Sequence, residues 1–521
     1  MADRAQPLGL WSGLFATALV LAVTLGTLGA VAFRAEGVLR LQPSDWAAIR
    51  FTVVQAALSA LISVALAIPL ARALARRRFA GRRVLVTLLG APFILPVIVA
   101  VLGLLAVFGR NGLVSVALGW IGLGPVQIYG LHGVVLAHVF FNMPLATRLI
   151  LQGWLAIPAE RLRLGASLGF TPRDMFRTLE LPMLRATVPG ALVVIFLICT
   201  SSFAVALALG GGPRATTVEL AIYQAFRFDF DLSKAAALAL VQFAIGATAA
   251  ALAYRIALPS GIGSGLDRQP RHWGIGHWAL RVQDGVVILF AAAFLLTPLL
   301  MIVLKGAPGL FSLPQSVLLA AMRSVLVALA SAILTLLVAL PMALLIQRSR
   351  GAARGLIETA GYLTISASPL VLGTGLFILI FPFADPFLLA LPVTALVNAL
   401  MALPFVLRAI LPALRDTEAD FGRLADSLAL TGMARLRLLI LPRLRRPLGF
   451  AAGLSAALSM GDLGVVALFA DPARATLPLQ LYRLMAAYRM DDAAAAALLL
   501  LAASLALFWL FDRGGRMHAD T

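Results

Sequence analysis

The stretch ERLRLGASLGFTPRDMFRTLELPML (residues 160–184) decides the fold, because it is a polar, arginine-rich insert between two long apolar runs. A second insert with the same spacing, ADFGRLADSLALTGMARLRLLILPRL, occupies residues 419–444. Aligning Leu181-Pro182 with Leu441-Pro442 displaces the chain by half of its 521 residues. Two matching polar inserts in an apolar chain predict a duplicated protein with two matching surface contacts.

The composition places this chain in a membrane. Hydrophobic residues make up 61% of it, charged residues 12%, and the mean hydropathy is +0.98, whereas soluble domains average about 25% charged residues. A net charge of +19 would otherwise suggest a nucleic-acid partner. Here the arginines lie in short loops between apolar segments, so we expect no nucleic acid and take the lipid bilayer as the surrounding partner.

Apolar runs long enough to cross about 30 Å of hydrocarbon, which needs about 20 helical residues, recur along the whole chain. They predict an all-α polytopic membrane protein with about twelve transmembrane helices. The predicted spans are residues 10–33, 52–74, 84–108, 130–151, 186–209, 234–257, 284–304, 317–346, 356–381, 386–410, 447–470 and 493–511.

The arginine distribution predicts the orientation. With both termini in the cytoplasm, most of the 42 Lys and Arg residues fall in cytoplasmic segments or at their edges, as the positive-inside rule requires. Both inserts are then cytoplasmic, and the two copies form a parallel repeat. Pro69 matches Pro341 at a larger displacement than Pro144 matches Pro404. The two halves therefore differ by an insertion or deletion between Pro69 and Pro144 of the first half.

The repeat divides the chain into three parts. Residues 1–258 form the first repeat with a cytoplasmic loop at 155–185, and residues 284–521 form the second repeat with a cytoplasmic loop at 413–446. Residues 259–283, rich in Gly and Pro, form the cytoplasmic linker between them.

Each insert is expected to contain a helix, a turn, and a second helix that ends near the proline, because proline lacks an N–H donor. The turns are placed at residues 169–172 and 429–432. Leu164, Leu168, Met175 and Leu179 would form one apolar face of the first insert. A single copy would be explained as an interfacial amphipathic helix, but two copies with one spacing favour a docking element.

This pattern resembles the EAA loop of permease subunits in bacterial binding-protein-dependent ABC importers, and the resemblance covers essentially the whole chain. It implies a type I importer fold in the inner membrane, two copies of an ATPase subunit docked on the cytoplasmic loops, and a periplasmic substrate-binding protein. The loop residues that carry the match are Arg163, Leu164, Gly165, Gly169, Leu179, Leu181 and Pro182, and then Arg423, Leu424, Ala425, Ala429, Leu439, Leu441 and Pro442. The family's Glu-Ala-Ala is Arg-Leu-Gly and Arg-Leu-Ala here, which puts a charge contact of the family glutamate in doubt. Ala429 stands in place of the family glycine, so the second turn is expected to use Gly432.

Three further segments, residues 137–152, 209–225 and 458–469, resemble the thiamine branch of this family. The resemblance implies import of thiamine, with its phosphates as further substrates, by alternating access. The alternative is a ferric iron permease, since those chains are also fused and duplicated. A secondary transporter driven by an ion gradient is less favoured, because only Asp462 and Glu358 provide intramembrane carboxylates.

No catalytic site is expected in this chain. Its two lysines, Lys234 and Lys305, do not occur in the Gly-Lys-Ser/Thr pattern of a P-loop, so a separate subunit must hydrolyse ATP. One cysteine, Cys199, and five histidines without metal-ligand spacing predict no metal site and no cofactor. A membrane enzyme finds no support, because no paired acid or nucleophile is present.

Candidate substrate-pathway residues are Asp462, Ser202, Tyr223 and Glu219. Asp462 lies within an apolar run, where a carboxylate is costly and marks a functional site, or else it is a structural residue that accepts hydrogen bonds from the backbone or Ser459. Ser202 occupies its position in the first repeat. Glu219 and Tyr223 either line the outer entrance or belong to a solvated loop. His138 is interpreted as a helix-packing residue.

Overall fold

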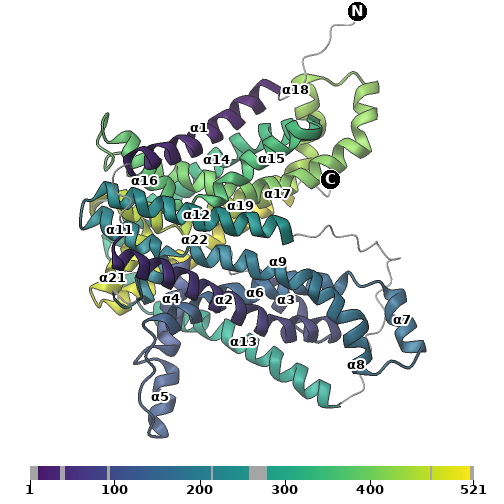
Figure 1. Cartoon of the computed structure of the whole chain (residues 1–521), viewed down its shortest axis with the longest axis vertical. Coiled ribbons are helices and arrows are strands. Elements are labelled where there is room, and N and C mark those ends of the chain that lie inside the picture. The colour runs from purple at the N-terminus through teal and green to yellow at the C-terminus, as the bar shows by residue number, and fades with distance from the viewer. Residues whose placement is uncertain are drawn as a thin grey trace, which may run out of the picture.

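The computed structural model of the chain describes residues 10–35, 41–90, 94–212, 215–256, 278–469 and 472–516. These residues form helices and, within these ranges, no strand (Figure 1). Eleven helices are long and apolar enough to cross a membrane, or twelve if one bent pair counts as a span. The predicted all-α polytopic architecture is therefore confirmed. Most of the predicted linker lies outside the described residues.

The helices follow one order in both halves. The first half contains α1 (Leu10–Ala35), α2 (Pro43–Arg76), α3 (Arg82–Leu88), α4 (Val97–Phe108), α5 (Leu113–Trp120), α6 (Leu131–Leu155), α7 (Ala159–Ser167), α8 (Pro172–Met175), the π-helix η2 (Phe176–Glu180), α9 (Leu181–Thr200), α10 (Phe203–Leu209), α11 (Val218–Arg227) and α12 (Leu232–Ile256). The second half contains α13 (Trp278–Gly306), η4 (Leu310–Ser312), α14 (Gln315–Arg348), α15 (Gly351–Ser366), α16 (Pro369–Ile380), α17 (Ala390–Ser427), α18 (Gly432–Arg435), the π-helix η5 (Leu436–Ile440), α19 (Leu441–Met460), α20 (Gly464–Phe469), η6 (Pro472–Arg474), α21 (Leu477–Ala486) and α22 (Met490–Arg516).

Matching elements have matching lengths. Helices α2 and α14 have 34 residues each, and α9 and α19 have 20 each. The insertion predicted between Pro69 and Pro144 is α5 with the chain that follows it, for which the second half has no counterpart among the described helices. Figure 1 shows α7, α8 and α18 at one end of the long helices, which we call the loop end. Helices α11 and α21 lie at the opposite, far end.

The two halves exchange their first helices. Helix α1 packs against α14 and α16 of the second half, and α13 packs against α2 and α4 of the first half (Figure 1). Glycines permit the close approach. A Cβ added at Gly375 would lie 2.6 Å from the backbone oxygen of Thr27, and one at Gly103 would lie 2.7 Å from that of Pro298. The halves are therefore interlocked.

Several predicted spans are interrupted. The span at 84–108 consists of α3 and α4, and the span at 356–381 bends by 90° between α15 and α16. Pro96 and Pro369 begin the helices that follow these breaks, because proline cannot donate the hydrogen bond that would continue the helix before it. The spans at 186–209 and 447–470 break at Ser201-Ser202 and at 461–463. Backbone freed in this way is tolerated within a membrane only inside the protein.

We expect Gly375→Val to lower the melting temperature of the detergent-solubilised protein, because the new side chain meets backbone atoms of α1 that cannot move aside. Overpacking of this kind costs about 1–3 kcal/mol. The matched control is Gly26→Val, since a Cβ at Gly26 has nothing within 4 Å. Equal melting temperatures for the two variants would contradict the tight contact between α1 and α16.

Candidate functional site

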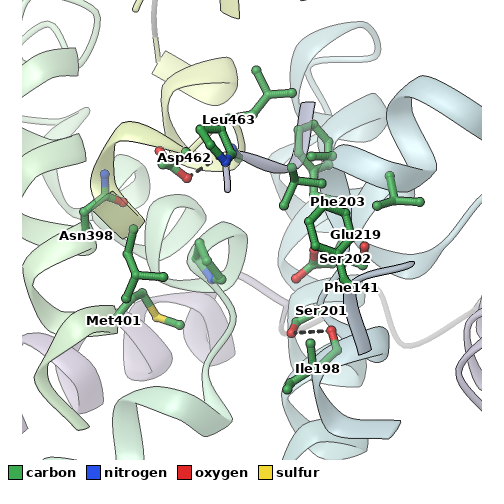
Figure 2. A pocket seen from close by; sticks show the side chains of 18 of the residues that line it. Phe141, Ile198, Ser201, Ser202, Phe203, Glu219, Asn398, Met401, Asp462 and Leu463 are labelled. Atoms are coloured by element: carbon green, nitrogen blue, oxygen red, sulfur yellow. Dashed lines mark hydrogen bonds between the residues drawn. The ribbon is translucent and has the colours of Figure 1, made fainter. Parts of the chain in front are cut away.

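A cavity of about 370 Å³ lies where the two halves meet (Figure 2). The first half contributes α6, the α9–α10 break and α11, and the second half contributes α17 and the α19–α20 break. Its polar lining consists of His138, Asn142, Ser201, Ser202, Glu219, Asn398 and Asp462. Its apolar lining includes Phe141, Ile198, Phe203, Met401, Phe405 and Leu458. The interrupted helices thus place polar side chains in the interior of an otherwise apolar bundle.

Asp462 lies against the backbone N–H groups at the start of α20 and against the Asn398 side chain. Its Oδ1 accepts a hydrogen bond of 3.2 Å from the N–H of Gly464, at the start of α20. Its Oδ2 is buried and has no hydrogen-bond partner among the described residues. Ser459, the side-chain partner considered from the sequence, accepts a hydrogen bond of 3.0 Å from Asn398. The second oxygen of Asp462 therefore makes no well-aligned hydrogen bond within the described residues, although it faces the cavity.

Glu219 is the second carboxylate of this cavity. Thr217 caps α11 by accepting from the N–H of Leu220, which fixes Glu219 in the first turn of that helix. The side chain is fully buried, and within the described residues its carboxylate interacts with the Ser368 hydroxyl and the Phe203 backbone without a well-aligned hydrogen bond. Burial raises the pKa of Glu219 to about 7, and the Ser368 hydroxyl and the Phe203 backbone only partly oppose this shift. The interpretation of Glu219 as part of a solvated loop is wrong.

Figure 2 shows Asp462 and Glu219 reaching the cavity from different sides. Asp462 comes from the α19–α20 break of the second half, and Glu219 comes from α11 of the first half. Among the described residues, the lining of this cavity includes no lysine or arginine. A cavity with two carboxylates and no basic side chain favours a cationic ligand.

His138 connects three helices beside the cavity. Its Nε2 shares a hydrogen bond of 2.6 Å with Ser202, and its Nδ1 shares one of 3.3 Å with Ser59 of α2. The packing role expected for His138 agrees with these contacts. Asn398, which sequence reasoning missed, occupies the position in α17 that His138 occupies in α6. The alignment of the two repeats contained this signal, because the displacement that pairs Ser202 with Asp462 also pairs these two residues.

Tyr223 is not among the residues that line the central cavity, unlike Asp462 and Glu219. It lies at a second cavity of about 480 Å³ with Asp45, Lys234 and Tyr482. The rings of Tyr223 and Phe203 meet edge to face with centroids 5.2 Å apart. Tyr223 therefore packs behind a residue of the central cavity rather than in it.

The two inserts present matching pairs of exposed leucines at the loop end. Leu164 and Leu168 are 59% and 63% exposed, and Leu424 and Leu428 are 56% and 61% exposed. Gly165 and Ala425, one residue after each first leucine, are buried. The expected single apolar face is wrong, because Met175 turns inward onto Gly165 while the two leucines point outward. Exposed leucines outside the apolar belt of a membrane protein are typical of a protein-docking surface.

The remaining predicted loop residues surround these leucines. Arg163 and Arg423 are exposed, Leu179, Leu439, Leu181 and Leu441 are half-buried, and Pro182 and Pro442 are exposed. The prolines do not end a helix, which corrects that expectation. Each follows a π-helical turn in which the N–H of Leu181 or Leu441 bonds five residues back, and each occupies the first turn of the next helix. Proline is tolerated in the first turn of a helix because a backbone N–H at that position would have no partner within the helix.

The turns of the two inserts hold a left-handed residue at matching positions, although the residues differ. Gly169 has φ +69°, and Ala429, which stands in its place, has φ +51°. Gly432 also has a positive φ of +54°, as expected for the second turn. Ala429 therefore holds a left-handed conformation that disfavours any residue with a Cβ.

A duplicated helical bundle with a central cavity and two matching docking loops at one end defines the permease subunit of an ABC importer. No protein-family model matches the chain. It is 39% identical to the thiamine transport system permease protein of Salmonella typhimurium, over 100% of both chains. It is also 39% identical to that of Escherichia coli, over 98% of both, and 38% identical to that of Brucella abortus, over 90% of this chain and 87% of the relative. The chain belongs to the family of thiamine transport system permease proteins.

We expect Ala429→Gly to stabilise the second loop by up to about 1 kcal/mol, because glycine has no Cβ and so avoids the penalty of a positive φ. The larger conformational entropy of glycine in the unfolded chain opposes this gain and limits its size. The N–H of Leu430, which donates to Ala425, then exchanges with deuterium up to about fivefold more slowly. Gly169→Ala is the converse control and should speed exchange at Phe170, whose N–H donates to Gly165. Faster exchange in Ala429→Gly would contradict the strain.

Proposed function

We propose that this permease carries thiamine through the central cavity. The observation that carries the proposal is the pair of carboxylates, Asp462 and Glu219, which face one cavity from the two halves. Neither forms an ion pair among the described residues, and three of their four oxygens lack a well-aligned hydrogen bond there. The thiazolium ring of thiamine is a permanent cation, and a buried carboxylate without a partner is stabilised by such a charge. The apolar lining, including Phe141 and Phe405, suits the aromatic rings.

Ser202, which corresponds to Asp462 in the repeat, contributes a hydroxyl to the same cavity. Asp462, Glu219 and Ser202 are therefore the proposed pathway residues, and Tyr223 is proposed only as a support behind them. The names of the three relatives favour thiamine over the ferric iron alternative. Thiamine phosphates are included as substrates on the resemblance alone.

The two loops, residues 155–185 and 413–446, are the proposed docking sites for two copies of an ATPase subunit. Support comes from their paired exposed leucines and from their position at one end of the bundle. Clusters of arginine at this end, including Arg72, Arg76 and Arg77 of α2, favour a cytoplasmic loop end by the positive-inside rule. Both termini and the linker at 259–283 are then cytoplasmic, between repeats at 1–258 and 284–521, in the inner membrane.

The far end is then periplasmic and receives a substrate-binding protein. The second cavity, with Asp45, Asp229 and Lys234, gives this end a polar concave surface. Substrate released there passes α11 and reaches the two carboxylates. Movement of the loops by the ATPases would change which end of the central cavity is open, as alternating access requires.

The proposed function is tested by reconstituting the chain in lipid vesicles with its ATPase and binding protein. We expect uptake of labelled thiamine only when ATP is supplied on the side of the membrane that the loop end faces. A proton or sodium gradient without ATP should give none. Uptake driven by a gradient alone, or selective binding of Fe(III) by the soluble partner, would overturn the proposal.

Asp462→Asn should lower thiamine uptake by about tenfold or more, because it removes a charged interaction of about 1.5–3 kcal/mol while keeping the shape of the side chain. Glu358→Gln serves as the control, since Glu358 lies in a half-exposed ion pair with Arg354 and Arg415 away from the cavity. The measurement is the initial uptake rate in the same vesicles at equal permease content. Unchanged specificity and rate in Asp462→Asn would end its role as a substrate contact.

A further inference from the structure

Helices α2 and α14 each connect a loop, the central cavity and a short helix at the far end. They have equal lengths, so their residues correspond position by position. At the far end, Thr52 of α2 accepts a hydrogen bond of 2.9 Å from the N–H of Val218, the first residue of α11. The matching residue of α14, Ser324, accepts one of 2.8 Å from the N–H of Leu477, the first residue of α21. Each long helix therefore holds the start of one short helix through a buried hydroxyl.

The same two helices hold the walls of the cavity. Gln55 of α2 donates a hydrogen bond of 2.8 Å to the backbone oxygen of Cys199 in α9, and Ser59 contacts His138 in α6. In the second half, Thr335 of α14 shares a hydrogen bond of 2.9 Å with Ser455 in α19. A displacement of α2 or α14 along its axis must therefore move both a cavity wall and a far-end helix.

The loop ends of these helices differ between the halves. Arg72 of α2 forms an ion pair of 2.8 Å with Glu180, the last residue of the π-helix η2 in the first loop. The Phe176 ring of the same turn stacks on the Arg72 guanidinium, 5.4 Å from its centroid. The positions that match Arg72 and Glu180 are Leu344 and Ile440, which are buried in one apolar cluster. One loop is held to its helix by charge and the other by apolar packing.

A second ion pair extends the charged contact to the other half. Arg76 and Arg77 of α2 pair with Asp284 of α13 at 3.2 and 2.7 Å. Asp284 and Glu180 are both almost completely buried. Separating a buried ion pair is costly because each separated charge is left uncompensated in a poorly hydrated site. Helix α2 therefore cannot slide past the first loop without breaking the Arg72–Glu180 ion pair.

We propose that α2 and α14 transmit displacement of the two loops to α11 and α21. The Arg72–Glu180 ion pair is the positioning contact of the first half, and the Leu344–Ile440 pair is its apolar equivalent in the second. This inference rests on the proposed docking of ATPases on the loops. The displacement of α11 moves Glu219 at the central cavity, since Glu219 is the residue after Val218 in that helix.

The chain supplies its own rescue variant. Arg72→Leu removes this ion pair from the buried Glu180, and Glu180→Ile removes it from the half-buried Arg72. The double variant installs the two apolar residues found at the matching positions of the second half. We expect each single variant to lower ATP-dependent thiamine uptake at least tenfold while ATP hydrolysis by the bound ATPase persists. The double variant should return uptake to within about threefold of the unmodified protein. Glu358→Ile, which removes an acid from a half-exposed pair at the same end, should change neither quantity.

A second measurement reports each half separately. In a Cys199→Ser background, a fluorophore is attached at Gln224→Cys on α11 or at Ala486→Cys on α21, both exposed. In the unmodified pair, ATP addition to the complex should change both signals. Glu180→Ile should abolish the change on α11 and preserve it on α21, a difference that general damage to the fold would not produce.

The two outcomes that overturn the inference are distinct from failure of the proposed function. A double variant as defective as the single variants, or equal loss of both fluorophore responses in Glu180→Ile, would show that the ion pair does not transmit movement along α2. Failure of the ATPase to bind the unmodified protein in a pull-down assay would instead remove the docking of ATPases and, with it, the basis of this inference.

Discussion

The structure depends on the requirement that backbone polar groups within hydrocarbon find partners inside the protein. Helices satisfy it along their length, and a break is tolerated only where other helices enclose it. The breaks at Ser201-Ser202 and at 461–463 meet this condition, because both line the central cavity between the halves. The same enclosure buries Glu219 fully and Asp462 partly. The polar site is thus a consequence of where the bundle permits a helix to be interrupted.

Duplication supplies the frame, and differences between the copies supply the chemistry. The two loops share their exposed leucines and their π-helical turns, so they offer similar surfaces to similar partners. The cavity, by contrast, has a carboxylate at Asp462 where the first half has Ser202, and another at Glu219 where the second half has Leu479 in α21. A site made of unlike halves can hold an asymmetric ligand in one preferred orientation. A site made of two identical halves would hold the same ligand equally well in two orientations.

The features that sequence predicted are those fixed by composition and spacing. Apolar runs gave the spans, and the repeated Leu-Pro spacing gave both loops and placed them on one side. Breaks within spans were missed because a run of apolar residues looks the same whether or not its helix is interrupted. Glu219 was not placed from sequence in the interior, since its burial depends on α11 folding back between the halves. The left-handed conformation of Ala429 was also missed, because alanine itself does not indicate a positive φ. Only the alignment of Ala429 with Gly169 in the repeat indicates it.

The exchange of first helices has a consequence for how the protein is made. Helix α1 is synthesised before α14 and α16, its packing partners in the second half, which emerge only after the whole first half has left the ribosome. Until then, the glycine-lined contact of α1 with these two helices cannot form, so the first half remains an incomplete assembly in the bilayer during translation. The order of synthesis therefore requires that an early helix keep one face unpacked until helices from the middle of the chain arrive.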